Sequence, residues 1–187
     1  MRHPAPRVLA IDPGTVHMGV AVLEAEALIH HAVESVKNRR SPHEILSACR
    51  RVVLRLLRDF RPATIACERT FFANNRNAAL LNVLSDEICE IARQQRILFV
   101  GLAPSTVKRA VTGDGSADKG AVATAVAARF PELLGYLAHD RKSTSRYYSN
   151  MFDAVALALA VRDRGVDQRQ SRASKIRRQA IRASRTA

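Results

Sequence analysis

The chain has 187 residues, of which 47% are hydrophobic, so it is long and apolar enough for one folded domain and is not a wholly disordered chain. Its 30 Lys and Arg against 17 Asp and Glu give a formal net charge of +13, which favours a polyanionic partner, nucleic acid before an anionic membrane. Three widely spaced cysteines argue against a zinc knuckle or a disulfide framework, and without a long apolar window we expect neither a signal peptide nor a membrane span.

The first third of the chain predicts three strands and a helix. Apolar, β-branched runs at 8–11, 19–23 and 28–36 are separated by short gaps, which is typical of antiparallel hairpins. A helix is expected to begin at Ser41-Pro42, because proline is tolerated in a first turn and apolar residues then recur at helical spacing as far as Phe60.

Strands and helices alternate in the remainder of the chain. Residues 112–116 are expected to form a loop, and 134–149 are polar and mixed, without a clear period. Three hairpin strands followed by this alternation predict an α/β layered domain with a mixed sheet. The expected elements are strands at 63–67 and 97–102 and helices at 74–93, 107–111, 121–130 and 153–161.

The composition changes near the end of the chain. From Arg162 onward, nine Lys and Arg face two Asp, a net charge of +7, and few apolar residues are larger than Ala. We therefore expect a folded domain over 1–163 and a basic, disordered tail over 164–187. The tail is either a solvated end or an arm that lies along phosphates, and the two readings are compatible.

Three carboxylates stand at the ends of predicted rigid elements. Asp12 ends the first strand, Glu68 ends a central strand, and Asp153 begins the last helix. Each alone could be a turn former or a helix cap, Asp153 in particular. Carboxylates brought together at the centre of a sheet would repel one another, and a divalent cation normally relieves that repulsion. Oxygen ligands without a His or Cys cluster favour Mg²⁺ or Mn²⁺ over zinc.

Four segments, in order, resemble the motifs of RuvC-type Holliday-junction resolvases. The first motif alone is weak evidence, because actin-like ATPases contain similar sequences. The order and spacing of all four motifs, however, match over about residues 7–163. The segments are VLAIDPGT at 8–15 with GVAV at 19–22, IACERTF at 65–71 with Asn75 and Ala78-Ala79, Val107-Lys108 with the basic loop at 111–119, and Asp153-Ala154 with 156–158.

The resemblance implies a ribonuclease H-like fold with a mixed five-stranded sheet flanked by helices. It further implies two Mg²⁺ ions in each active site, for which Mn²⁺ can substitute, and a homodimer that nicks two symmetric strands of a four-way DNA junction. The products would carry 5′-phosphate and 3′-hydroxyl ends. A cytoplasmic, nucleoid-associated enzyme is expected, and a branch-migration helicase is left open as a partner.

The resemblance also assigns the site. By carry-over, Asp12, Glu68 and Asp153 are catalytic metal ligands. Lys108 and Lys119 match lysines near the scissile phosphate, where they would stabilise transition-state charge; outside the motif each would be read as a solvated surface charge.

Position 150 departs from the family pattern. The family usually has an acid or a His three residues before the last Asp, and Asn150 stands there, offering only a neutral oxygen as the fourth ligand. His139 and Asp140 lie nearby in sequence, but their spacing gives little support for a compensating role.

Phe71 matches a family aromatic that wedges against bases at the crossover. Phe71 and Phe72 could instead be core residues, but the stretch around them is polar and basic, which suits a nucleic-acid surface. The expected DNA contacts are Phe71, Arg69, Arg76, Lys108 and Lys119.

Two alternatives to a junction resolvase remain open. One is a related ribonuclease H-like nuclease acting on RNA or other branched DNA. The other is a non-cleaving junction-binding module in which Asn150 is the lesion.

Overall fold

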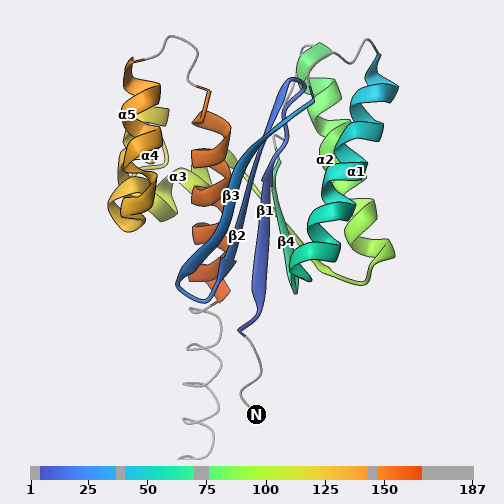
Figure 1. The fold of residues 1–187 in the computed structure, drawn as a ribbon, viewed down its shortest axis with the longest axis horizontal. Helices are drawn as coiled ribbons and strands as arrows, with labels where there is room; N and C mark the ends of the chain where they lie inside the picture. The colour runs from blue at the N-terminus through green and yellow to red at the C-terminus, as the bar shows by residue number, and fades with distance from the viewer. Residues whose placement is uncertain (1–4, 37–40, 70–75, 143–146, 166–187) are drawn as a thin grey trace, which may run out of the picture.

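The computed structural model describes residues 5–36, 41–69, 76–142 and 147–165 (Figure 1). Its strands form one mixed sheet in the order β3-β2-β1-β4-β5. β1 (Arg7–Asp12), β2 (His17–Glu24) and β3 (Ala27–Ser35) form an antiparallel meander, while β4 (Thr64–Glu68) pairs in parallel with β1 and with β5 (Leu98–Leu102). The predicted hairpins and the five-stranded mixed sheet are confirmed.

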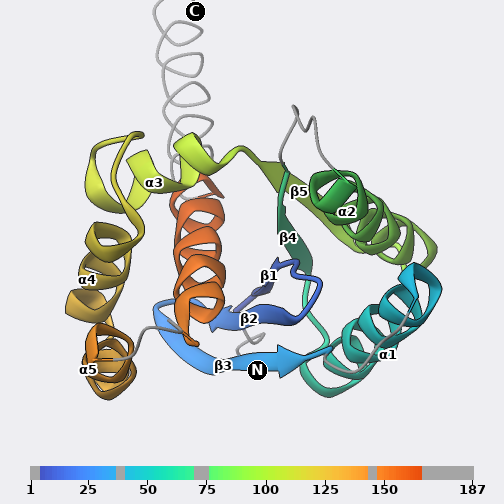
Figure 2. The ribbon, with the colours of Figure 1, turned by 90° about the horizontal axis from the view of Figure 1, so that it is seen from above.

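Helices cover both faces of the sheet. α1 (Pro42–Phe60) and α2 (Arg76–Gln94) lie on one face (Figure 1). Residues 149–165 form a helix against the other face, with α3 (Pro104–Thr112), α4 (Lys119–Arg129) and α5 (Leu134–Lys142) packed on its outer side (Figure 2). A short 3₁₀ turn, η1 (Pro131–Leu133), joins α4 to α5.

Side-chain alternation along β1 explains how both faces are filled. Leu9 and Ile11 pack towards α1 and α2, whereas Ala10 between them faces the helix at 149–165. That helix is buried between the sheet and α3–α5, so it is apolar all round and rich in Ala. Its close approach is clearest at Gly19, where a β-carbon would overlap the backbone carbonyl of Asn150.

Residues 134–142, which show no clear period in the sequence, form α5, where Leu137 is buried, Tyr136 is half-buried and Leu134 is exposed. One sequence-based expectation needs correction. Asp153 does not begin the last helix, which starts with the two polar residues Ser149 and Asn150. Asp153 is therefore not the N-cap.

The remaining boundaries move by a few residues. Pro104 begins α3, and Gly113 ends it in the left-handed region with φ of 82°. The helix at 149–165 crosses the expected domain boundary at 163/164, and residues 166–187 lie outside the described part of the chain. Within the described ranges, no helix has the length and apolar composition that crossing a membrane requires.

Candidate active site

The parallel pairing of β1 and β4 brings two acids to one edge of the sheet. Ile11 is opposite Cys67, so Asp12 and Glu68, the next residue of each strand, emerge side by side. Asp12 is also opposite Gly19 of β2, and Gly19 contacts the backbone of Asn150 at the start of the last helix. Asp153, one helical turn further along, is thereby placed over the same edge.

The three carboxylates perturb one another. Burial raises the pKa of Asp12 well above its usual range, and the charges of Asp153 and Glu68 raise it further. Burial, followed by the charge of Asp153, raises the pKa of Glu68 to about 6. The sheet therefore gathers the three predicted acids into a site that favours positive charge.

Lys119 supplies positive charge at this site. It is the first residue of α4, whose N-cap Asp118 accepts a hydrogen bond from the Ala121 amide at 2.8 Å. The Lys119 ammonium donates to Asp153 Oδ2 at 2.7 Å and to Ser149 Oγ at 3.3 Å. Burial opposes the charged form of Lys119, but its pKa is nevertheless raised, because Asp153 and then the other acids stabilise the ammonium.

Lys108 reaches the same site from α3. It is half-buried, and its charge lowers the pKa of Glu68. Both predicted lysines thus contribute to the electrostatics of the carboxylate cluster.

Asn150 joins the start of the last helix to β2. Its side-chain nitrogen donates to the backbone carbonyl of His17 at 2.6 Å. A β-carbon on Gly14 would lie 3.0 Å from that nitrogen and would overlap the His17 carbonyl, so the turn between β1 and β2 has no spare room here. The amide N–H of Asn150 is used structurally, and the predicted role of its oxygen as a metal ligand stays a prediction.

The donor set fits hard divalent cations. Its members are carboxylates, crowded and withdrawn from water, which is the chemistry Mg²⁺ and Mn²⁺ prefer. Among the described residues, no three Asp, Glu, His or Cys side chains are already drawn together closely enough to hold a metal ion. The ammonium of Lys119 instead neutralises Asp153.

The predicted DNA contacts are only partly described. Arg69 pairs with Asp86 of α2, and its guanidinium lies 5.8 Å from the centre of the Phe99 ring. Phe71 and the side chain of Arg76 lie outside the described residues, so their DNA contacts stay predictions.

Sequence reasoning missed two polar residues of α2 beside Glu68 and Arg69. Ser85, only 4% exposed, donates its hydroxyl to the Glu68 carbonyl at 3.4 Å. Asp86 beside it holds Arg69. Their signal in the sequence is a polar pair inside the apolar repeat of α2. Asp140, weighed as a substitute ligand, accepts from the Tyr148 amide at 3.1 Å and so serves the fold.

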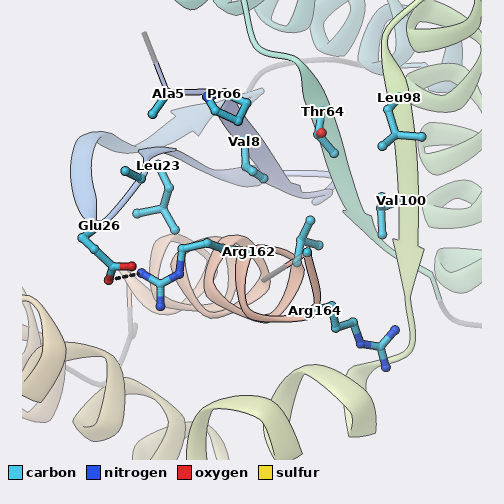
Figure 3. A pocket seen from close by; sticks show the side chains of 13 residues that line it. Ala5, Pro6, Val8, Leu23, Glu26, Thr64, Leu98, Val100, Arg162 and Arg164 are labelled. Atoms are coloured by element: carbon cyan, nitrogen blue, oxygen red, sulfur yellow. Dashed lines mark hydrogen bonds and ion pairs between the residues drawn. The ribbon is translucent and has the colours of Figure 1, made fainter. Parts of the chain in front are cut away.

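A pocket of about 650 Å³ lies away from these acids. It is lined by Val8 at the start of β1, Leu23 at the end of β2 and Val100, with Arg162 at its rim paired to Glu26 at 2.8 Å (Figure 3). Because Asp12 lies at the other end of β1, this pocket is separate from the carboxylate site.

The comparison with known families decides the identity. The family model described as "Crossover junction endodeoxyribonuclease RuvC" matches residues 8–161, most of the chain. The chain belongs to the RuvC family. This assignment confirms the resemblance found in the four motifs, together with the ribonuclease H-like α/β fold and the endodeoxyribonuclease class.

Individual RuvC relatives agree over most of their length. RuvC of Thermobifida fusca is 31% identical over 169 residues, covering 87% of each chain. RuvC of Clavibacter michiganensis is 35% identical over 159 residues, 82% of this chain and 74% of the relative. The structure of Thermus thermophilus RuvC in complex with Holliday junction substrate superposes with a TM-score of 0.67 at 26% identity, over 84% of this chain and 92% of that one.

Proposed function

We propose that this RuvC-family protein resolves four-way DNA junctions by paired, metal-dependent nicks that leave 5′-phosphate and 3′-hydroxyl ends. The observation that carries the proposal is the convergence of Asp12, Glu68 and Asp153 from two strands and a helix, with Lys119 bonded to Asp153. The junction-bound Thermus thermophilus relative supports the choice of substrate.

Asp12, Glu68 and Asp153 would hold two Mg²⁺ ions, or Mn²⁺ in their place, and the Asn150 oxygen would complete one of the sites. When bound, such ions activate a water molecule and stabilise the leaving 3′ oxygen. The chain prepares for them by keeping the carboxylates half-buried and mutually repelling, which the raised pKa values of Asp12 and Glu68 reflect.

Lys119 and Lys108 would act on the scissile phosphate. Lys119 is held at the carboxylate cluster by Asp153 and Ser149, so its ammonium is positioned before DNA arrives. A preorganised cation beside a reacting phosphate stabilises the charge that develops in the transition state. Lys108, on the neighbouring helix, adds a second positive charge.

The symmetry of a four-way junction indicates how many copies of the protein act on it. Two symmetric nicks need two active sites, so we propose that a homodimer acts, with Phe71 of each copy against the bases at the crossover. The net charge of +13 supplies sequence-independent attraction to phosphates. A branch-migration helicase that delivers junctions, and a place on the nucleoid, fit this role.

The test is incubation with a mobile four-way junction and Mg²⁺ or Mn²⁺, with the nicks mapped on all four strands. We expect paired symmetric nicks with ligatable ends, and none with Asp12→Asn. Single-stranded DNA, flaps and RNA–DNA hybrids run beside the junction. Preferential cleavage of one of those substrates would establish the related-nuclease alternative, and tight binding without cleavage would establish the binding module.

A further inference from the structure

Arg69 follows Glu68 directly and is fastened to two other elements. Its backbone N–H donates to the Leu102 carbonyl of β5 at 2.9 Å. Its guanidinium forms an ion pair with Asp86 of α2 and lies 5.8 Å from the centre of the Phe99 ring. Both ends of this residue are therefore held by groups of the protein itself.

The path of the Arg69 side chain explains a glycine in β5. A β-carbon on Gly101 would lie 2.7 Å from Arg69 Cδ, which is too close unless the Arg69 side chain moves, and 3.2 Å from Cγ. The aliphatic stem of Arg69 crosses β5 where Gly101 leaves room, and this route directs the guanidinium to Asp86.

Ser85, the residue of α2 before Asp86, binds the backbone carbonyl of Glu68. Ser85 donates its hydroxyl to the Glu68 carbonyl at 3.4 Å, and the Cys67 thiol lies 3.6 Å from the same hydroxyl. Consecutive residues of α2, Ser85 and Asp86, thus bind Glu68, the last residue of β4, and Arg69, which follows it. The carbonyl and the N–H of the peptide group between Glu68 and Arg69 are therefore both hydrogen-bonded, to α2 and to β5.

We propose that Arg69 is a positioning residue for the nuclease reaction, which holds the Glu68 carboxylate in register with Asp12 and Asp153 by tying β4 to α2 and β5. This inference rests on the proposed function and replaces the expected role of Arg69 as a DNA contact. The Arg69–Asp86 pair is on the surface, with the two side chains 36% and 66% exposed, so its loss costs little stability. An effect on turnover would then report on the geometry of Glu68.

The experiment compares three variants that disturb the same contact from three elements: Arg69→Gln, Asp86→Asn and Gly101→Ala. At saturating junction we expect each to lower kcat by about 10-fold or more, because small displacements of a reacting group are costly. Junction affinity, measured with Ca²⁺ in place of Mg²⁺, should stay within about twofold, and its salt slope should not move. The double variant Arg69→Gln/Asp86→Asn should be no slower than Arg69→Gln alone, because both changes break one contact.

Glu87→Gln is the matched control. Glu87 is next to Asp86 on α2 but pairs with Arg50 of α1, so its loss removes an ion pair of α2 without touching β4. This variant should keep the wild-type kcat. A second readout needs no turnover: the rise in Tm on adding Mg²⁺ should shrink in Arg69→Gln and persist in Glu87→Gln.

Two results would overturn the proposal. If Arg69→Gln weakens junction binding and lowers the salt slope by about 0.9 while Asp86→Asn does not, Arg69 is a phosphate contact. If all three variants keep the wild-type kcat, the contact does not position Glu68. Should Arg69→Gln fail to fold, Gly101→Ala and Asp86→Asn decide by the same measurements. A wild-type protein that leaves every junction uncut would instead contradict the proposed function.

Discussion

The side-chain amide of Asn150 donates a hydrogen bond to the backbone carbonyl of His17 at 2.6 Å, joining residues 133 positions apart. A carbonyl oxygen accepts and cannot donate, so the nitrogen of the amide must face His17. This hydrogen bond links the start of the last helix to the first residue of β2. An acid at position 150 would place an oxygen against that carbonyl.

Asn150→Asp should therefore have two opposite effects. Without metal, the variant loses a donor and gains a repulsion, and we expect the free energy of unfolding to fall by about 1–3 kcal/mol. With Mg²⁺, the added carboxylate should tighten the cation and recover part of the loss. Urea unfolding in EDTA and in Mg²⁺ measures both effects. A variant as stable as wild type in EDTA would show that the His17 contact contributes nothing.

Replacing the acids should separate chemistry from binding. Asp12→Asn, Glu68→Gln and Asp153→Asn should each abolish nicking while leaving junction affinity close to wild type, because the acids serve the reaction and phosphate contacts serve affinity. Gel-shift titration beside a cleavage assay provides the measurement. Glu90→Gln is the control, since the side chain of Glu90 is 40% exposed and contacts its own helix, through Arg93 and Gln94. Wild-type nicking by Glu68→Gln would remove Glu68 from the site.

In the metal-free protein, the contribution of Glu68 to stability should fall as the pH rises through the acidic range. The folded pKa of Glu68 is about 6 against an ordinary 4.5, raised by burial and then by Asp153. Between these values the Glu68 carboxyl binds more protons in the folded state than in the unfolded state, so its contribution to the free energy of unfolding falls as pH rises from 4.5 to 6.

Thermal unfolding in EDTA at pH 4.5, 5.5, 6.5 and 7.5 would measure this dependence, with those values chosen to bracket the window of about 4.5–6. Glu68→Gln should be the more stable protein at pH 7.5 and should lose that advantage towards pH 4.5. Parallel pH curves for the two proteins would mean that Glu68 titrates normally in the fold.

Deleting residues 168–187 should weaken binding to all DNA about equally. The segment lies outside the described structure, and this prediction rests on its seven Lys and Arg and its lack of any acid. The slope of log affinity against log salt should become flatter by about 0.9 for every phosphate that the shortened chain no longer binds. Fluorescence anisotropy on junction and duplex DNA over a salt series gives the slope. Loss of junction preference would show that the segment recognises structure, and an unchanged slope would show that it binds no phosphate.

Sequence signals predicted the structure correctly where both partners of a contact lie in one short segment. Ser41-Pro42 predicted the start of α1, and Ser41 Oγ does accept a hydrogen bond from the Glu44 amide. Asp12 and Glu68 could likewise be placed together, because both follow apolar strands that a mixed sheet sets side by side.

Contacts that depend on register between distant elements could not be read from the chain. Nothing near Arg69 marks Asp86 as its partner 17 residues away, because that pairing depends on how α2 packs on β4. Asp153 was placed at a helix start rather than inside a helix, since Ser149 and Asn150 carry no apolar signal. The family motifs supplied what spacing alone could not.

Gly19 influences the distance between Asp12 and Asp153. Because a β-carbon there would overlap the Asn150 carbonyl, the missing side chain sets how deeply the last helix sits on β2. Asp153 lies on that helix, and Asp12 is opposite Gly19 in the sheet. A methyl group added at Gly19 would therefore push the helix away and increase the distance between the two carboxylates, although it contacts neither of them. A displacement of about 1 Å is enough to cost a reaction roughly 10²-fold. Selection for catalysis can thus act on a residue that has no functional group at all.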